Sequence, residues 1–426
     1  MKPKYVYFSA VLIILISLFF LSCGIEGAEF DWPRWRGPNG DGISQETEWN
    51  PTALDGGPKI LWKTDIGVGH ANIVIKENRL YAAGFTRDGM NVACLNADTG
   101  QEIWRSPFEG AVEIYSTPAT DGKFVYAISL RGIIVCLKSK NGKLRWKRDL
   151  ASECNLVKPT YGYGASVVVE GDLLVLTANT SGLVLNKKTG ELVWDSQKPP
   201  KKKDWQGSST GTDHSTPVVY DYAGKNHAVL SSYEGIHGVD IQTGQVLWLY
   251  EWDYYRIQVA DPIVFDNRVF VAKYCELGSF LLDIEQGVVK VLWKNENLSS
   301  DVSSPVLVDG YVYGCDGGPE TGFGTIRCLD VETGELMWED DLRGGEWPRL
   351  RNASLISAAG KLIILEDDGT LHIAEASPSG YQEIGSCDVL EGERIKRWFW
   401  THPVLCNGKI YCRNYPGDLI CIDVRN

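Results

Sequence analysis

The sequence predicts an all-β fold, an eight-bladed β-propeller whose blades are four-stranded antiparallel sheets. Two observations carry this prediction. A short motif that ends in tryptophan recurs along the 426 residues, and β-branched segments joined by tight Gly- or Asn-bearing turns lie between its copies. Apolar residues almost never repeat with helical spacing, which disfavours an α-rich protein. Repetition of one small sheet therefore governs the fold.

The repeated motif has the form Asp/Asn-x-x-Thr-Gly-x-x-x-Trp. Complete copies begin at Asn96, Asn186, Asp240 and Asp330. Its last position is occupied by Trp62, Trp104, Trp146, Trp194, Trp248, Trp293 and Trp338. Successive tryptophans lie 42 to 54 residues apart, a period that fits four short strands. A large flat side chain in the fourth strand would pack between neighbouring blades, so we interpret the series as structural.

Counting these units gives eight blades and a closed ring. Six tryptophans end complete units, and a seventh unit, from Leu350 to about Leu390, has no tryptophan. The last unit, Trp400 to Val424, contains only three strands. We expect residues 59–65, which include Trp62, to supply its fourth strand, because a strand from the N-terminus would leave no exposed sheet edge. The propeller is thus predicted to span residues 59–426.

The first residues resemble an export signal. Lys2 and Lys4 precede an apolar run that is followed by Ser-Cys23-Gly, so we expect residues 1–22 to be a signal peptide. Cys23 stands where bacterial lipoproteins carry their lipidated cysteine. The resemblance implies an outer-membrane anchor at Cys23, with the protein facing the periplasm or the cell surface; the alternative is a periplasmic or secreted protein. Residues 23–58 form a segment rich in Trp, Arg and Gly.

Charge and cysteine usage exclude several classes of protein. A net charge of −13 disfavours nucleic acid and anionic lipid surfaces as partners, which leaves a lipid anchor as the only expected membrane contact. Four of the 11 cysteines occupy one repeat position, on four different blades, and read as small buried hydrophobes: Cys94, Cys136, Cys328 and Cys421. No Cys-x-x-Cys spacing occurs, so no metal site is predicted.

Four stretches carry a family resemblance: residues 32–44 (Trp-Pro-Arg-Trp-Arg-Gly-Pro-Asn-Gly-Asp-Gly-Ile-Ser), 161–166, 303–314 and 360–369. With them the chain resembles the bacterial propeller repeats named after pyrroloquinoline quinone (PQQ), in the quinoprotein alcohol dehydrogenase-like superfamily. It is also similar to the BamB outer-membrane assembly lipoproteins, which are eight-bladed and bind no PQQ. The resemblance establishes fold better than activity.

Two functions follow from the resemblance. Catalytic relatives place a disulfide between adjacent cysteines near the quinone, hold Ca²⁺ with carboxylate and amide oxygens, and use an Asp base and an Arg. Here no two cysteines are adjacent, and no full ligand set can be matched residue by residue. We therefore expect a monomeric, non-catalytic binding or scaffold propeller of the cell envelope that needs no cofactor and binds an envelope protein or a small polar ligand. The alternative is a dehydrogenase that oxidises an alcohol or sugar with PQQ and Ca²⁺.

Candidate binding residues come from aligning the units at the proline that opens several first strands. Asp261 and His402 stand one place before it, and the candidates taken from three places before it are Tyr163, His214, Arg351 and Trp400. First strands surround the channel of a propeller, so we expect these six side chains at its mouth. Asp261 and His402 belong to units three blades apart, which argues against direct contact. Hydrogen bonding to loop backbone or channel water is the alternative role.

Two loops are expected to reach the channel as well. The insertion from Lys198 to Trp205 is basic with an aromatic tip, and could cap the channel or simply be solvated. The segment 32–44 is rich in Gly and Pro and holds Trp35 and Arg36. We expect it to pack as a loop across a blade or the channel mouth.

Overall fold

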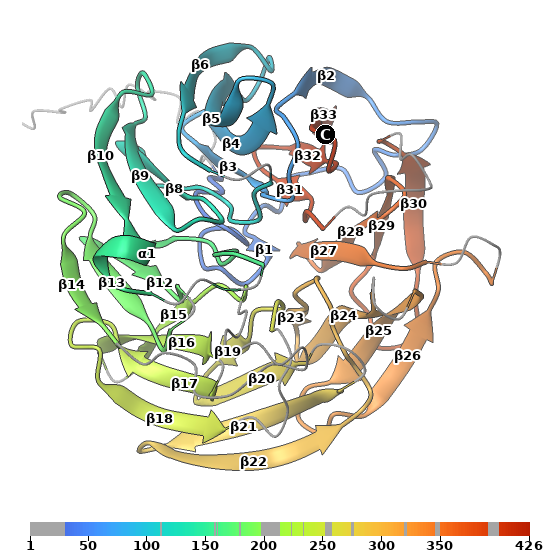
Figure 1. Cartoon of the computed structure of the whole chain (residues 1–426). Helices are drawn as coiled ribbons and strands as arrows, with labels where there is room; N and C mark the ends of the chain where they lie inside the picture. The colour runs from blue at the N-terminus through green and yellow to red at the C-terminus, as the bar shows by residue number, and fades with distance from the viewer. Residues whose placement is uncertain are drawn as a thin grey trace, which may run out of the picture.

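The computed structural model describes residues 30–110, 113–156, 159, 161–178, 180–196, 214–222, 224–232, 234–251, 258–273, 277–318, 322–345, 350–390 and 400–426. These residues form eight β-sheets arranged as blades around a common axis, which confirms the predicted fold class (Figure 1). Within these ranges the single helix is α1 (Leu150–Glu153), and no helix is long and apolar enough to cross a membrane. Cys23 and the Lys198–Trp205 insertion lie outside the described residues.

Blades 1 to 6 are each built from four consecutive strands that run from the axis outward. Blades 1 to 3 contain β3 (Ile73–Lys76), β4 (Arg79–Thr86), β5 (Gly89–Asn96), β6 (Glu102–Pro107); β7 (Ala119–Thr120), β8 (Phe124–Ile128), β9 (Ile133–Lys138), β10 (Leu144–Asp149); and β11 (Val168–Glu170), β12 (Leu173–Leu176), β13 (Leu183–Asn186), β14 (Leu192–Asp195). Blades 4 to 6 contain β15 (Val218–Tyr222), β16 (Lys225–Ser232), β17 (Gly235–Asp240), β18 (Val246–Glu251); β19 (Ile263–Phe265), β20 (Arg268–Ala272), β21 (Ser279–Glu285), β22 (Val288–Asn295); and β23 (Val306–Val308), β24 (Tyr311–Gly317), β25 (Gly324–Asp330), β26 (Leu336–Asp340).

Blades 7 and 8 both include a strand from the N-terminal part of the chain. Blade 7 contains β27 (Ala353–Ala358), β28 (Lys361–Glu366), β29 (Thr370–Glu375) and β30 (Glu383–Asp388), and β1 (Ile43–Ser44) pairs with its innermost strand in parallel. Blade 8 contains β31 (Val404–Leu405), β32 (Lys409–Arg413), β33 (Asp418–Asp423) and, as its outer strand, β2 (Ile60–Asp65). The antiparallel β2–β33 ladder closes the ring with the predicted strand.

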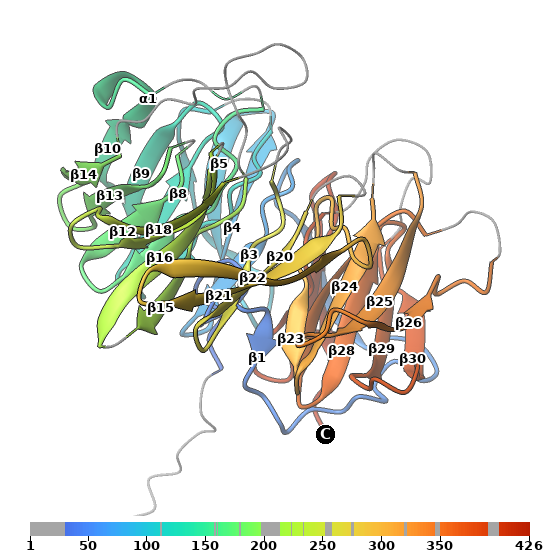
Figure 2. The ribbon, with the colours of Figure 1, turned by 90° about the horizontal axis from the view of Figure 1, so that it is seen from below.

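The N-terminal segment runs along one face of the ring, which we call the hairpin face. This face carries the turns between first and second strands and between third and fourth strands of the blades. The Glu46 carboxylate accepts hydrogen bonds from the backbone N–H groups of Asn407 (2.6 Å) and Gly408 (2.7 Å), in the β31–β32 turn. Figure 2 shows β1 and the C-terminus at this same face.

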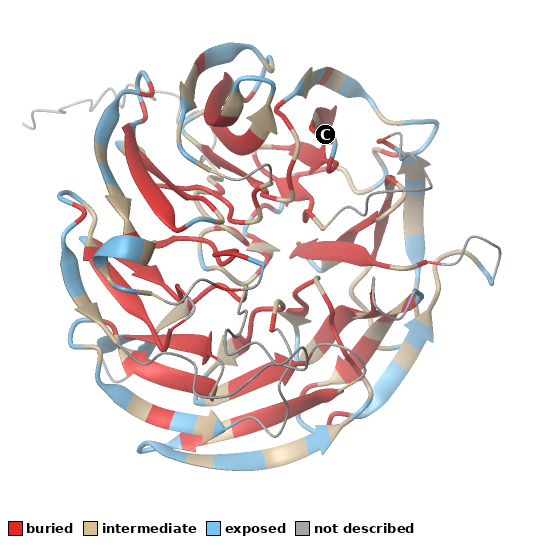
Figure 3. Ribbon diagram, in the orientation of Figure 1, coloured by how far each residue is buried: buried red, intermediate tan, exposed pale blue. Residues whose placement is uncertain are grey.

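The core lies between blades, where the inner strands are buried and the outer strands alternate with solvent (Figure 3). The repeat cysteines fill this core opposite the signature tryptophans: Cys94 pairs with Trp104, and Cys421 pairs with Trp62. All nine described cysteines are free thiols, and those at the repeat position are buried, as predicted.

Signature tryptophans join each blade to the next through a hydrogen bond. In six of the seven, the indole Nε1 donates to a backbone carbonyl of the following blade at 2.8–3.0 Å; the acceptors are Ala97, Ser139, Lys187, Ile241, Val331 and Ser377. In five of these junctions the glycine of the next blade's third-to-fourth-strand turn (Thr-Gly in four, Asn-Gly in one) lies so close to the indole that an added Cβ would stand 2.6–2.8 Å from the ring. Trp248 is the exception, because its buried Nε1 donates to no backbone carbonyl among the described residues and lies beside the Tyr220 hydroxyl of its own blade.

This difference predicts unequal effects of one substitution at two repeat positions. Trp104→Phe removes the 2.8 Å hydrogen bond to the Ser139 carbonyl, which keeps only the longer bond from Arg79 Nη1 (3.5 Å), whereas Trp248→Phe removes no bond to a backbone carbonyl. We expect Trp104→Phe to lower the free energy of unfolding by about 1 kcal/mol more than Trp248→Phe does. Urea unfolding followed by circular dichroism measures both values. Equal destabilisation by the two variants would contradict the role assigned to the indole–carbonyl bond.

Candidate functional site

A chain of hydrogen bonds links the inner ends of blades 1 to 6. In each step, the backbone N–H of the residue just before a first strand donates to the side-chain oxygen of the equivalent residue in the next blade. The donors and acceptors, at 2.6–3.1 Å, are Asn72 to Thr117, Thr117 to Ser166, Ser166 to Thr216, Thr216 to Asp261, and Asp261 to Ser304. Asp261 is thus one member of a structural ring around the axis.

The same ring corrects the alignment used to select two of the candidates. Ser166 occupies the place of Thr117, although the proline alignment put Ala165 there, because the unit has Val167 where others have proline. A shift of one residue moves a strand side chain to the opposite face. Tyr163 is accordingly buried between blades 2 and 3, in a cluster with Tyr126 and Leu150.

Arg351 is displaced in the same way, in a unit that also lacks the proline. Burial raises the pKa of the Asp367 carboxyl to about 6, and the nearby Arg351 cation opposes this shift. Contacts between aromatic side chains join His214 and Trp400 in one group. Asp261 and His402 belong to a second group, because both contact Trp35. Tyr163 and Arg351 belong to neither group.

Trp35 bridges the two candidates that come from distant blades. Its indole Nε1 donates to Asp261 Oδ2 at 2.5 Å, and its ring stacks on His402 with 4.8 Å between centroids and 20° between planes. The loop predicted over residues 32–44 therefore enters the axis from the hairpin face. The space left beside Trp35 and Asp261 is about 10 Å³, room for at most one water molecule.

The guanidinium of Arg36 is a buried cation next to this contact. Its Nη2 donates to the carbonyl of Pro305 (2.5 Å) and to that of Asp41 (2.7 Å), and the side chain is 2% exposed. Burial lowers the pKa of Arg36 and raises the pKa of Asp261 to about 6, while the attraction between the two groups opposes both shifts. Burial, together with the Arg36 cation, holds the pKa of His402 well below its usual range, so His402 is neutral at pH 7.

A second group of aromatic side chains occupies the other end of the channel. His70 stacks on Trp400, with 4.1 Å between centroids and 17° between planes, and Tyr415 lies against His70 at 4.5 Å. Tyr115 contacts both His70 and His214. The tyrosine hydroxyls donate to one carboxylate, that of Glu113, and burial lowers the pKa of His214 to about 4.

This aromatic group presents partly exposed rings and one carboxylate, a surface that can bind an apolar or neutral polar group. Sequence reasoning missed three of its members: His70, Tyr115 and Tyr415. An alignment on the residues of the hydrogen-bonded inner ring would have included His70. Asn72 is the ring member of blade 1, and His70 stands two residues before it, as His214 stands two residues before Thr216. No group of three or more His, Cys, Asp or Glu side chains that could hold a metal ion occurs within the described residues.

The raised pKa of Asp261 predicts a pH-dependent stability. In the unfolded chain this carboxyl has its ordinary pKa of 3.8, so the folded state binds the proton more tightly between about pH 4 and pH 6. The contribution is fully present below pH 4 and is lost as pH rises through 6, a change of about 3 kcal/mol. We expect the difference in unfolding free energy between wild type and Asp261→Asn to fall by this amount from pH 4 to pH 7. A constant difference in urea titrations would contradict the buried carboxyl.

Comparison with known proteins identifies a family to which the chain is similar. The family model described as outer membrane protein assembly factor BamB matches residues 88–339, more than half of the chain. BamB of Escherichia coli strain K12 is 25% identical over 369 residues, which cover 74% of this chain and 88% of that protein.

Two solved structures are similar in fold. BamB from Moraxella catarrhalis superposes with a TM-score of 0.59 at 18% identity, covering 86% of this chain and 97% of that one. A europium-containing methanol dehydrogenase superposes with a TM-score of 0.64 at 13% identity, covering 90% and 89%. Such identities show shared architecture alone. The family match does more, and by it the chain belongs to the family of the outer membrane protein assembly factor BamB.

Proposed function

We propose that this chain is an exported, non-catalytic scaffold propeller of the bacterial cell envelope, which binds a protein that assembles the outer membrane. The observation that carries the proposal is that the chain's own N-terminal segment fills one end of the channel. Trp35 and Arg36 fill its hairpin end, and Asp261 and His402, the candidates best suited to acid–base chemistry, hold that segment in place. Membership in the BamB family supports the same role.

A quinone and Ca²⁺ fit these residues poorly. Ca²⁺ requires several hard oxygen ligands around one point, and the described residues contain no such group of carboxylates. Asp261 is committed to the Trp35 indole and the Thr216 backbone, and the sequence has no adjacent cysteines. We therefore propose that the dehydrogenase-like fold is used here without PQQ, and we derive no reaction step through it.

Purification from solubilised membranes tests the scaffold role. The full-length chain should co-purify with an outer-membrane β-barrel protein or another member of its assembly machinery, because a scaffold acts through a stable protein interface. Chemical cross-linking followed by mass spectrometry identifies the partner. Absence of any envelope protein, together with dye reduction when PQQ, Ca²⁺ and an alcohol are added, would establish the dehydrogenase instead.

The proposed anchor has its own test. Cys23→Ser removes the thiol that would carry the lipid, so the variant should no longer fractionate with the outer membrane. A single acyl chain binds membranes only marginally, and a lipoprotein anchor holds through more than one. Fractionation and the mass of the mature N-terminus measure this. Unchanged membrane association of the variant, together with an unmodified Cys23 in the wild type, would exclude the anchor.

A further inference from the structure

The aromatic group at the end of the channel away from the hairpin face, here called the loop end, holds one carboxylate among its rings. The hydroxyls of Tyr115 (3.0 Å) and Tyr415 donate to separate oxygens of Glu113. An ionised carboxylate has about four lone-pair positions, so each oxygen of Glu113 keeps acceptor capacity. Glu113 is partly exposed, and a ligand can therefore approach this carboxylate.

Backbone hydrogen bonds fix the position of the group. The N–H of His70 donates to the carbonyl of Ile114 (2.8 Å), which places the residues on either side of Ile114 next to His70. The N–H of Gly69 donates to the carbonyl of Tyr415 (3.0 Å). Gly69 has a φ of 151°, and a Cβ there would stand 2.8 Å from Ile114 Cγ2. Segments of blades 1, 2 and 8 thus meet at this site without any ligand.

The rings form walls around Tyr115. His70, His214 and Trp400 lie 5.4–6.3 Å from Tyr115 between centroids, and each is inclined to it by 44–49°. At these angles the rings meet Tyr115 obliquely and do not stack on it. The face of an aromatic ring carries partial negative charge and attracts cations.

The carboxylate gives the site a negative charge. Glu113 forms no ion pair with any described residue, because its partners are the two tyrosine hydroxyls. Burial lowers the pKa of His214 to about 4, so His214 is neutral at pH 7. Arg413 lies beside the same segment, but its guanidinium donates to three backbone carbonyls, those of Gly67, Ala71 and Ala83.

These features select a ligand by charge, shape and hydrogen bonding. A guanidinium is planar, stacks on aromatic faces, and donates parallel N–H bonds to both oxygens of a carboxylate. A quaternary ammonium ion is attracted by the rings but has no donor for Glu113. A neutral sugar has donors but leaves the charge of the carboxylate without a counter-charge. The guanidinium alone matches all three features.

We propose that the loop end of the channel binds an arginine side chain of a partner protein, with its guanidinium on the Glu113 carboxylate and against the rings of Tyr115 and Trp400. The site rests on the proposed scaffold function, which requires a protein partner. Trp35 and Arg36 fill the hairpin end, so the partner approaches from the loop end. The net charge of −13 favours a partner with a basic surface.

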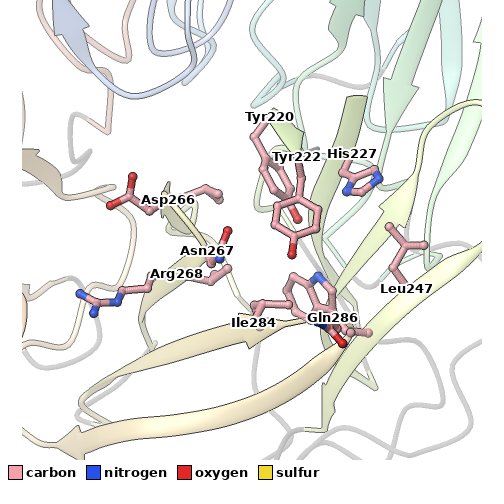
Figure 4. Close-up of a pocket in the computed structure, with 13 residues that line it drawn as sticks. Tyr220, Tyr222, His227, Leu247, Asp266, Asn267, Arg268, Ile284 and Gln286 are labelled. Carbon is pink, nitrogen blue, oxygen red and sulfur yellow. The ribbon is translucent and has the colours of Figure 1, made fainter. Parts of the chain in front are cut away.

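A second aromatic pocket provides an internal comparison. It has a volume of about 230 Å³ and lies between blades 4 and 5, where Figure 4 shows Tyr220, Tyr222 and His227. The charged residues of its lining are Asp266 and Arg268, of opposite sign. Because this pocket already contains a guanidinium beside a carboxylate, we expect it to bind no further cation. Tyr222→Leu is therefore a control that should leave arginine binding unchanged.

The probe is Nα-acetyl-L-argininamide, titrated into ¹⁵N-tryptophan-labelled protein. The indole N–H signal of Trp400 is assigned by its loss in Trp400→Phe. We expect a saturable shift of the Trp400 signal with the arginine derivative. Nα-acetyl-L-citrullinamide has nearly the same shape without the charge, and should bind at least about tenfold more weakly.

Glu113→Gln removes the charge and keeps an acceptor for the tyrosine hydroxyls, so it should weaken binding of the arginine probe at least about tenfold. The matched control is Glu109→Gln, which loses the same charge where the carboxylate pairs with Lys147 (2.9 Å), and should bind as wild type does. If Glu113→Gln fails to fold, Tyr115 decides. Tyr115→Leu should lose binding, whereas Tyr115→Phe, which keeps the ring, should retain it.

Co-purification carries the test to the full complex. Glu113→Gln should recover less of the envelope partner than wild type, and Glu109→Gln should recover the same amount. If the arginine probe leaves the Trp400 signal unchanged while the partner still co-purifies, the site is wrong and the scaffold role stands. If the probe binds but Glu113→Gln retains the partner, or no partner is recovered at all, the occupant is not a partner's arginine.

Two further ligands distinguish the chemistry of the site. Tetramethylammonium that shifts the Trp400 signal as readily as the arginine probe would assign the site to small quaternary ammonium ions. Methyl β-D-glucoside that binds wild type and Glu113→Gln equally, where the arginine probe binds neither, would assign it to sugars. Either result would overturn the proposal.

Discussion

The ladder between β2 and β33 is the constraint on which the rest of the structure depends. No blade buries its own faces, because each hydrophobic cluster is shared by neighbouring blades. The cluster at the closure joins blades 7, 8 and 1 and includes Trp32, Trp49 and Leu54 from the N-terminal segment. Without β2, blades 8 and 1 would expose both a sheet edge and this apolar surface. Closure therefore makes the stability of every blade depend on both ends of the chain.

The N-terminal segment extends this dependence to the axis. Glu46 binds a turn of blade 8, β1 adds to blade 7, and Trp35 and Arg36 reach blades 5, 6 and 8. Such buried polar contacts add little net stability, because removing Arg36 and Asp261 from water offsets most of their attraction. They do tie the segment to particular blades, since Trp35 Nε1 donates to Asp261 and Arg36 Nη2 donates to the Pro305 carbonyl. Specificity, more than stability, is the effect of this polar group at the axis.

The repeat motif made the fold predictable, since the spacing of tryptophans counts blades and the unfinished last unit calls for a closing strand. Prediction of the site was weaker for a local reason. Tyr163 and Arg351 were aligned on a proline that their units lack, and an alignment error of one residue places a strand side chain on the opposite face. His214, Trp400, Asp261 and His402 were in register and do lie around the axis. The contact of Trp35 with Asp261, 226 residues away, follows no repeat and only the folded ring reveals it.

A repeat protein offers its own comparison for every side chain, and Trp248 and Trp35 are informative for that reason. Six signature indoles have carbonyl partners in the next blade, whereas the Trp248 indole lies over Gly238 of its own blade and beside the Tyr220 hydroxyl. Its departure therefore follows from the glycine that replaces the repeat cysteine opposite it, together with the altered hairpin of blade 5. A closed propeller can thus accommodate one junction that departs from the motif, because the other junctions and the closing strand hold the ring together.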